Sequence, residues 1–172
     1  MFVVLSDTHA TEDPGLTPAI REALADAEGL IHAGDFVRGP VLDAFQTMVP
    51  EVYAVHGNVD DDDIRARLPR SEIVTLGEFR LLVVHTVRGG ETGLATFGRE
   101  NEADLVISGH THNPGYTWTG SLGLLNPGSH SNPRGNRPAF ATLSVTNDAL
   151  EGALLEPDGS QFERFRVERE NR

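Results

Sequence analysis

The apolar residues in the first two thirds of the chain form short runs, each followed by a small or polar residue. Five of these runs are rich in aliphatic and β-branched side chains and have the length of buried strands: residues 2–5, 29–33, 52–55, 81–84 and 105–107. Between them, apolar residues recur at helical spacing over residues 17–27, 40–48, 61–68 and 91–101. This alternation predicts an α/β fold with a largely parallel sheet.

The pattern changes after residue 115, where helical spacing stops and Gly, Asn and Pro turns separate short apolar runs. We predict antiparallel strands at residues 116–118, 122–125, 139–145, 150–155 and 162–167. Two stacked sheets with helices outside them would accommodate both halves. Because no linker-like stretch divides the chain, we expect a single domain over residues 1–172.

Side chains that can bind metals follow each of the five strands predicted in the first two thirds. They are Asp7 and His9, then Asp35, Asn58 and His85, and finally His110 and His112. An Asp or Gly after a single strand is common in turns and means little alone. Ligands of open α/β sheets, however, bind at the carboxyl ends of the strands. Five such loops in one chain therefore indicate a shared site.

The spaced set of motifs resembles the calcineurin-like metallophosphoesterase superfamily. The motifs are Asp7-x-His9, Gly34-Asp35, Gly57-Asn58, His85 and Gly109-His110-Thr111-His112. The chain length and the later turn Asn126-Pro127-Gly128-Ser129 resemble its small bacterial and archaeal phosphodiesterases. The resemblance covers residues 1 to about 145. It implies a four-layer αββα sandwich of two mixed sheets flanked by helices.

The resemblance also implies a centre of two divalent ions. One ion would bind Asp7, His9, Asp35 and His112, and the other would bind Asp35, Asn58, His85 and His110. Asp35 would bridge the ions, and a hydroxide between them would be the nucleophile, so that Asp35, Asn58 and His110 serve catalysis through it. With no Cys in the chain, nitrogen and oxygen ligands suit Mn²⁺, Fe²⁺, Co²⁺, Ni²⁺ or Zn²⁺. Family analogy favours Mn²⁺.

The chain departs from the superfamily pattern at two positions. Many members have a His after Gly-Asn that protonates the leaving group, and Val59 stands there in this chain. Asp60 and His56 are alternative proton donors, although each residue equally suits a structural role. The His85 ligand is commonly followed by Gly, whereas Thr86 follows it here and would restrict the backbone.

Substrate contacts are less well indicated than metal ligands. His56 and Arg134 are candidates for binding the substrate phosphate, and Arg134 is equally compatible with a subunit contact or plain exposure. A homodimer is what family analogy suggests.

The composition bears on the salt conditions, the binding partners and the cellular location of the protein. The formal net charge is −12, and all 14 basic residues are Arg. Molar salt would screen the repulsion within such a surface, so we expect salt adaptation resembling that of halophilic archaeal proteins. The alternative is an ordinary acidic enzyme from a high-GC genome. We expect no stable nucleic-acid binding without a dense Arg cluster, and no membrane association. Without a recognisable signal peptide, a cytoplasmic protein is expected.

The sequence therefore predicts a metal-dependent phosphoesterase, and more specifically a phosphodiesterase acting on small or nucleotide-like phosphodiesters. A phosphomonoesterase and a nuclease are alternatives within the same chemistry. A metal-free scaffold, like the retromer subunit that has lost some ligands, is an alternative of a different class. All seven positions here keep metal-competent side chains, which argues against a scaffold.

Overall fold

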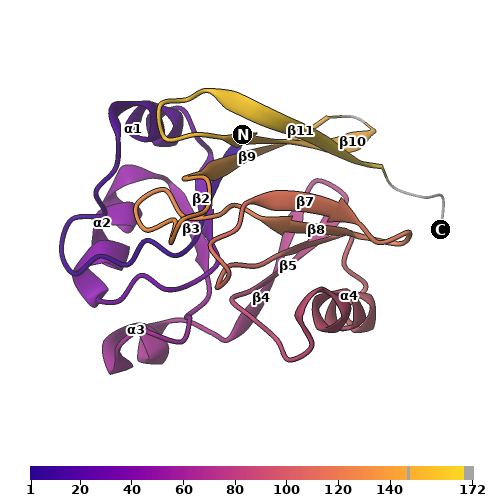
Figure 1. Ribbon diagram of the computed structural model, residues 1–172, viewed down its shortest axis with the longest axis horizontal. Coiled ribbons are helices and arrows are strands. Elements are labelled where there is room, and N and C mark those ends of the chain that lie inside the picture. Colours follow the sequence, from indigo (N-terminus) through magenta and orange to yellow (C-terminus); the bar gives the residue numbers. More distant parts are fainter. Residues whose placement is uncertain (147, 169–172) are drawn as a thin grey trace.

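The computed structural model describes residues 1–146 and 148–168. Within these residues, two mixed sheets are stacked face to face with helices on their outer sides (Figure 1). The α/β sandwich expected from the sequence is thus confirmed. The pattern missed one strand and the way in which the strands are distributed between the sheets.

The six-stranded sheet joins the first and last parts of the described chain, in the order β11-β10-β9-β1-β2-β3. Its parallel half comprises β1 (Phe2–Leu5), β2 (Gly29–His32) and β3 (Glu51–Ala54). Its antiparallel half comprises β9 (Phe140–Val145), β10 (Ala149–Leu155) and β11 (Gln161–Glu168). Strands β1 and β9 pair antiparallel and join the two halves.

The five-stranded sheet has the order β4-β5-β6-β8-β7. It comprises β4 (Ser71–Leu76), β5 (Phe79–Val84), β6 (Leu105–Ile107), β7 (Gly115–Trp118) and β8 (Gly123–Asn126). The sequence pattern missed β4, an edge strand that forms a hairpin with β5 through Gly77. It also gave β8 antiparallel partners alone, whereas β8 pairs in parallel with β6.

Four helices lie outside the sheets in the described chain. They are α1 (Pro18–Ala25), α2 (Gly39–Met48), α3 (Asp62–Arg67) and α4 (Gly90–Glu100). Helix α1 begins with Pro18 after an N-cap Thr17 whose hydroxyl accepts the Ile20 N–H. Figure 1 shows α4 on the outer side of the five-stranded sheet. None of the helices described is long and apolar enough to cross a membrane.

The largest core lies between the two sheets and draws residues from distant parts of the chain. Val4 and Ile31 from one sheet pack with Leu81 and Ile107 from the other, and all four are fully buried. Replacing such a residue as Leu81 by Ala would cost roughly 2–5 kcal/mol. This packing brings the carboxyl ends of both sets of parallel strands to one edge of the sandwich, where the polar loops meet.

Candidate metal centre

The loops after β1 and β2 continue to pair beyond the ends of their strands. The Asp7 N–H donates to the Gly34 carbonyl over 2.9 Å, and the His9 N–H donates to the Asp35 carbonyl over 3.0 Å. Short, well-directed backbone bonds of this kind restrict both loops. The ligand-bearing residues after the first two strands therefore stand on a fixed backbone ladder.

Glycine is required where two of the loops approach the buried carboxylates. A Cβ on Gly57 would lie 2.0 Å from Asp35 Oδ1, and one on Gly109 would lie 2.6 Å from Asp7 Oδ2. Any side chain at these positions would displace a predicted ligand. The Gly-Asn and Gly-His motifs thus have a steric reason that is independent of turn formation.

Unusual backbone conformations concentrate at the predicted ligands. Eight described residues other than glycine have positive φ, and five of them belong to the predicted set. These five are Asp7 (53°), His9 (46°), Asp35 (62°), His110 (71°) and His112 (57°). Each left-handed residue costs of order 1–3 kcal/mol, which the surrounding structure must offset. Such a concentration of strain points to a functional site.

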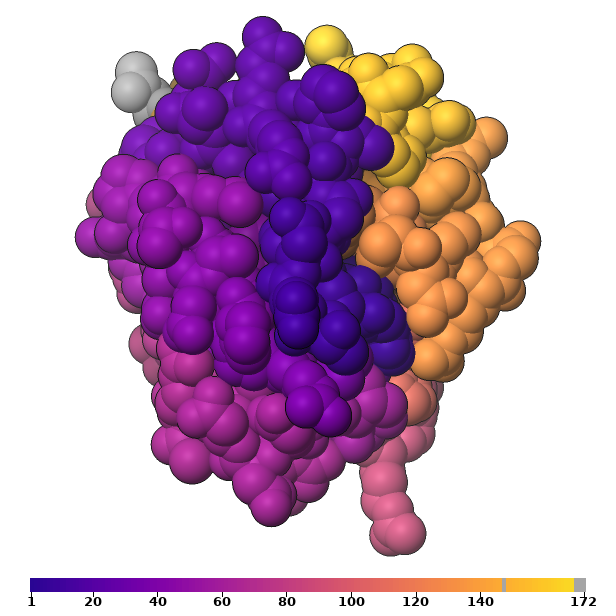
Figure 2. Space-filling view, turned by 90° about the vertical axis from the view of Figure 1, so that its left-hand side faces the viewer, coloured from indigo at the N-terminus to yellow at the C-terminus, as the bar shows by residue number. Residues whose placement is uncertain are grey.

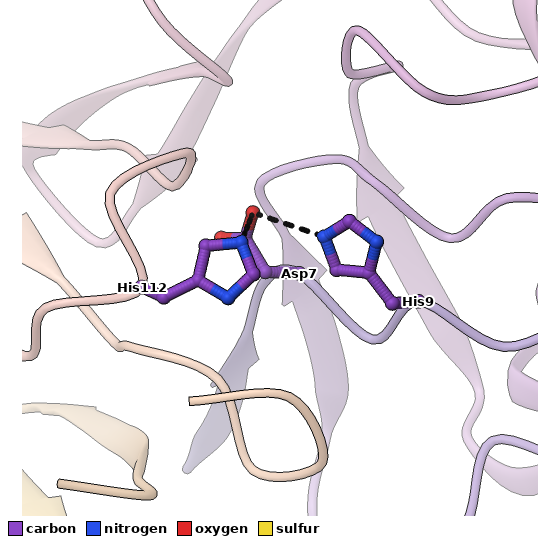
Figure 3. Close-up of side chains that lie close together, drawn as sticks. All are labelled: Asp7, His9 and His112. Atoms are coloured by element: carbon purple, nitrogen blue, oxygen red, sulfur yellow. Dashed lines mark ion pairs between the residues drawn. The ribbon is translucent and has the colours of Figure 1, made fainter. Parts of the chain in front are cut away.

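The first cluster consists of Asp7, His9 and His112 (Figure 3). Asp7 Oδ1 lies 3.2 Å from His112 Nε2 and 3.8 Å from His9 Nε2. Both ring nitrogens are buried, and neither has a hydrogen-bond partner among the described residues. The other His112 ring nitrogen, Nδ1, contacts the Asn132 carbonyl, which can only accept. His112 Nε2 therefore faces the carboxylate and is free to serve as a ligand atom.

The second cluster contains Asp35, Asn58, His85 and His110. His85 Nδ1 donates to the Ala33 carbonyl over 2.7 Å, so a neutral His85 ring has its lone pair on Nε2, whereas a protonated ring donates from both nitrogens. That Nε2 lies 3.3 Å from Asp35 Oδ2 and 3.0 Å from Asn58 Oδ1. His110 Nδ1 also approaches the Asn58 oxygen, at 2.8 Å. Several electron-rich atoms thus converge on the same space.

The electrostatics of this second cluster favour an ionised carboxylate. Burial alone would raise the pKa of Asp35, but contacts with His85, the Val59 N–H and His9 outweigh burial and lower it to about 2. Burial would lower the pKa of His85, and the Asp35 carboxylate outweighs this and raises it. The cluster therefore attracts positive charge, which can be a proton on His85 or a cation between the residues.

The residues present fit a metal site. Unpartnered buried imidazole nitrogens and a carboxylate oxygen within 4.8 Å of one another form a set of N and O ligands. A second such group comprises Asp7, Asp35 and His85. Asp35 Oδ2 also lies 3.5 Å from His9 Nε2, so this one oxygen stands between the two clusters. The structure thus brings together all seven residues that the sequence singled out.

The candidate substrate contacts are not drawn into these clusters. His56 is half-buried, and its Nδ1 contacts the neighbouring Gly57 carbonyl at 3.1 Å. Arg134 is exposed and makes no hydrogen bond or ion pair with any described residue. The Val59 N–H donates to Asp35 Oδ1 over 3.0 Å, while its side chain is 40% exposed. At position 59 it is the backbone that contributes to the site.

Asp60 is a buried loop organiser. Its carboxylate accepts the backbone N–H groups of Asp35, Val37 and Gly57 at 3.1, 2.7 and 2.6 Å. These three bonds engage both carboxylate oxygens. This arrangement favours the structural alternative for Asp60 over proton donation. Helix α3 is capped by the next residue, Asp61, whose side chain accepts the Ile64 N–H.

A segment that sequence reasoning did not connect to the centre holds its loops together. The Ser129 hydroxyl donates to the Asp7 carbonyl over 2.7 Å and accepts the Asn132 N–H over 2.9 Å. Ser131 donates to the Thr8 carbonyl over 2.7 Å. Figure 2 shows this orange part of the chain lying against the indigo N-terminal part. The Asn-Pro-Gly-Ser turn was visible in the sequence, but the carbonyls to which Ser129 and Ser131 donate are more than 100 residues away.

The Asn126 amide links the same turn to the His110 loop. Its Nδ2 donates to the Gly109 carbonyl over 3.0 Å and to Thr111 Oγ over 2.9 Å. Its Oδ1 accepts the Gly128 N–H over 2.8 Å. The turn after β8 therefore positions ligand loops of both sheets.

Backbone conformation and burial define two further residues near the site, Thr86 and His32. The backbone at Thr86 is outside the left-handed region, so the replacement of Gly carries no conformational penalty there. His32 is fully buried at the end of β2 and stacks on Phe36 with ring centroids 3.7 Å apart. Its Nδ1 accepts the Gly34 N–H, so Nε2 donates to Thr8 Oγ over 2.9 Å.

Comparison with known proteins agrees with this geometry. The profile of the calcineurin-like phosphoesterase superfamily domain matches residues 1–148. The chain belongs to the calcineurin-like phosphoesterase superfamily. It is 34% identical over 156 residues to a probable metallophosphoesterase of Methanothermobacter thermautotrophicus, covering 88% of this chain and 90% of that protein.

Two solved structures share the fold. The phosphoesterase Yfce of E. coli is 26% identical, with a TM-score of 0.72 over 96% of this chain and 98% of that one. Vps29 of Entamoeba histolytica, solved in complex with Zn²⁺, is 24% identical, with a TM-score of 0.79 over 97% and 98% of the two chains. Given its superfamily and its ligand set, the protein is a metal-dependent phosphoesterase.

Proposed function

We propose that this phosphoesterase is a phosphodiesterase with a two-metal centre, formed within one domain over residues 1–172. One ion would bind Asp7, His9, Asp35 and His112, and the second would bind Asp35, Asn58, His85 and His110. The observation that carries this proposal is the position of Asp35 Oδ2, 3.5 Å from His9 Nε2 and 3.3 Å from His85 Nε2. A carboxylate oxygen in that place can serve both ions.

When bound, two divalent ions supply a water molecule activated at neutral pH and positive charge for the phosphate oxygens. The chain's part is to hold the ligands and to limit their negative charge. Two carboxylates contribute about −2 against about +4 from the ions. The remaining ligands, Asn58 and the four His side chains, are neutral. They therefore leave the centre with a net positive charge. Mn²⁺ is our first choice of metal on family grounds.

The lack of an Arg fork at the predicted ligands of the described chain favours a diester over a monoester. A phosphomonoester carries up to about two negative charges near neutral pH, since its second pKa is about 6, whereas a diester carries about one. A dianion is commonly bound by Arg forks. Among the described residues, no Arg donates to a predicted ligand side chain. Arg65 donates instead to the Asn58 and Asp60 carbonyls, each over 2.8 Å.

Departure of the leaving group has no evident protein acid. Val59 cannot donate a proton from its side chain, and the Asp60 oxygens are occupied by backbone donors. General acid help is typically worth about 10²–10⁴-fold, and it matters most for basic leaving groups. We therefore propose that aryl diesters, whose leaving groups are stable as anions, are hydrolysed faster than alkyl diesters.

The test is an assay of metal-free protein supplied separately with Mn²⁺, Ni²⁺, Co²⁺, Fe²⁺ or Zn²⁺. Bis(4-nitrophenyl) phosphate and 4-nitrophenyl phosphate are compared at low and molar salt, because the charge of −12 predicts salt adaptation. We expect kcat/KM to be at least about tenfold higher for the diester. A preference for the monoester would refute the phosphodiesterase proposal. Full activity without any metal would refute the metal centre.

A further inference from the structure

A cavity of about 280 Å³ lies beside the candidate centre, between the start of α4 and the β7–β8 hairpin. His85 and Gly109 form its wall nearest the predicted ligands, and Leu94 and Leu124 line it on the side of α4 and β8. The volume equals that of about nine water molecules in the liquid. It has room for one organic group of up to about nucleoside size.

Hydroxyl groups in the cavity are free to bind a ligand. Thr86, Ser108 and Thr117 all line it, and their hydroxyls have no hydrogen-bond partner among the described residues. Ser108 is only 6% exposed, so its hydroxyl gains from a partner that replaces water. Thr86 stands where the superfamily commonly has Gly, and it adds one of these hydroxyls next to His85.

The charge of the lining restricts the ligand further. His85 and Glu91 are its ionisable residues, and no Arg belongs to this lining. An anionic group would lose water there without meeting a cationic partner, which is unfavourable. Apolar surface from Leu94 and Leu124 combined with free hydroxyls suits an uncharged group that carries both carbon skeleton and hydroxyls.

We propose that this cavity binds the organic group of the substrate, and that this group is uncharged, hydroxylated and no larger than one nucleoside. The inference rests on the proposed phosphodiesterase function, with the phosphate at the predicted ligands and one ester group in the cavity. It names a substrate class: phosphodiesters of a single sugar-sized or nucleoside-sized alcohol. Substrates with a second phosphate in this position are disfavoured.

Three substrates with the same leaving group test the substrate class. They are methyl 4-nitrophenyl phosphate, thymidine 5′-(4-nitrophenyl phosphate) and the latter with an added 3′-phosphate. All release 4-nitrophenol, so differences in kcat/KM report on the retained group. We expect the thymidine ester to exceed the methyl ester by about tenfold or more, and the 3′-phosphate to remove this advantage. Equal values for the three substrates would overturn the proposal.

A pair of matched variants places the effect in the cavity. Thr117 is exposed on edge strand β7, and Thr75 is exposed on β4, the opposite edge of the same sheet. Thr117→Phe should fill the cavity and raise KM for the thymidine ester about tenfold, while the methyl ester is unaffected. Thr75→Phe should change neither. Equal losses on both substrates, or no loss in Thr117→Phe, would refute the cavity as the binding site.

A binding experiment separates this inference from the proposed function. Thymidine alone is titrated into Mn²⁺-free, Zn²⁺-loaded protein while the methyl NMR signals of Leu94 and Leu124 are followed. Shifts in the unmodified protein that disappear in Thr117→Phe would support the cavity even if no diester were hydrolysed. No shift at either residue would refute it, whatever the enzyme hydrolyses.

Discussion

The two clusters of the candidate centre differ in how deeply their side chains are buried and how well they are supported. In the first, Asp7 and His112 are fully buried, and the neighbouring backbone is held by Ser129. In the second, Asn58 and His110 are exposed, and their side chains meet at 2.8 Å. A buried, supported ligand set is preorganised for its ion, whereas exposed ligands must be ordered when the ion binds.

This difference teaches how one site can combine tight metal retention with access for substrate. The buried cluster has little freedom and should bind its ion more tightly. The second cluster borders solvent at Asn58 and His110, where a phosphate can reach it. Asp35 Oδ2 stands between the two clusters, so a substitution of Asp35 should affect both clusters at once.

Asp35→Asn should have the largest effect. It removes the negative charge shared by both ions while preserving side-chain shape, so kcat/KM should fall by at least about 10³-fold. Metal content per chain and the unfolding temperature are measured alongside, and the fold should persist. Near-normal turnover by a fully metallated Asp35→Asn protein would refute the bridging role proposed for Asp35.

Single His variants should separate the two clusters. We expect calorimetry to show a tight and a weaker metal-binding event in the unmodified protein. His112→Ala should remove the tight event and His110→Ala the weaker one, and each should reduce kcat/KM by about 10²-fold or more. If both variants lost the same event, the assignment of the clusters to different ions would be wrong.

Ser129→Ala should weaken the buried cluster without touching a ligand. The substitution leaves the Asp7 carbonyl and the Asn132 N–H without their partner, and Asn132 in turn contacts His112. Loss of such a support typically costs about 10–100-fold in metal affinity. Calorimetry should show this loss in the tight event alone. Ser144→Ala, a half-buried serine on β9, is the control and should change neither event.

We expect the smallest effect from pH. It acts through His32, whose ring bonds to Thr8 beside the first cluster. Burial lowers the pKa of His32 well below its ordinary value of 6.5, so the folded protein keeps this ring neutral. Its contribution to stability is full above pH 6.5 and is lost as pH falls below that value, because the unfolded chain then binds a proton. The unfolding temperature of metal-free protein should fall between about pH 7.5 and about pH 5.5. His32→Gln should show a smaller fall, and an equal one would exclude this residue as the cause.

Much of the architecture could be predicted because the strands carry continuous aliphatic runs that end in Gly, Asp, Asn or His. Strand β4 was missed because Ser71 and Glu72 open it and its alternation is short, although the Ile73 to Thr75 stretch before Gly77 was a usable signal. Parallel pairing of β8 with β6 could not be read from either strand, since register between distant segments is set by packing.

The candidate ligands could be proposed from spacing, yet their support could not. Ser129 and Asp7 are 122 residues apart, and a serine in a turn gives no sign of a partner at that distance. Asp60 shows the opposite problem. In the sequence, an acidic residue next to a ligand loop suggests a role in catalysis. Its three backbone partners became visible only in three dimensions.

The left-handed backbone at the predicted ligands has a consequence for the evolution of this architecture. Five positions retain strain that glycine would relieve, so drift from the ligand residues to glycine would relax the fold. A lineage that no longer needed hydrolysis would lose catalysis without losing its sandwich, and its surfaces would be free to serve as a docking platform. Selection for chemistry, and not for stability, is then what keeps Asp and His at these places.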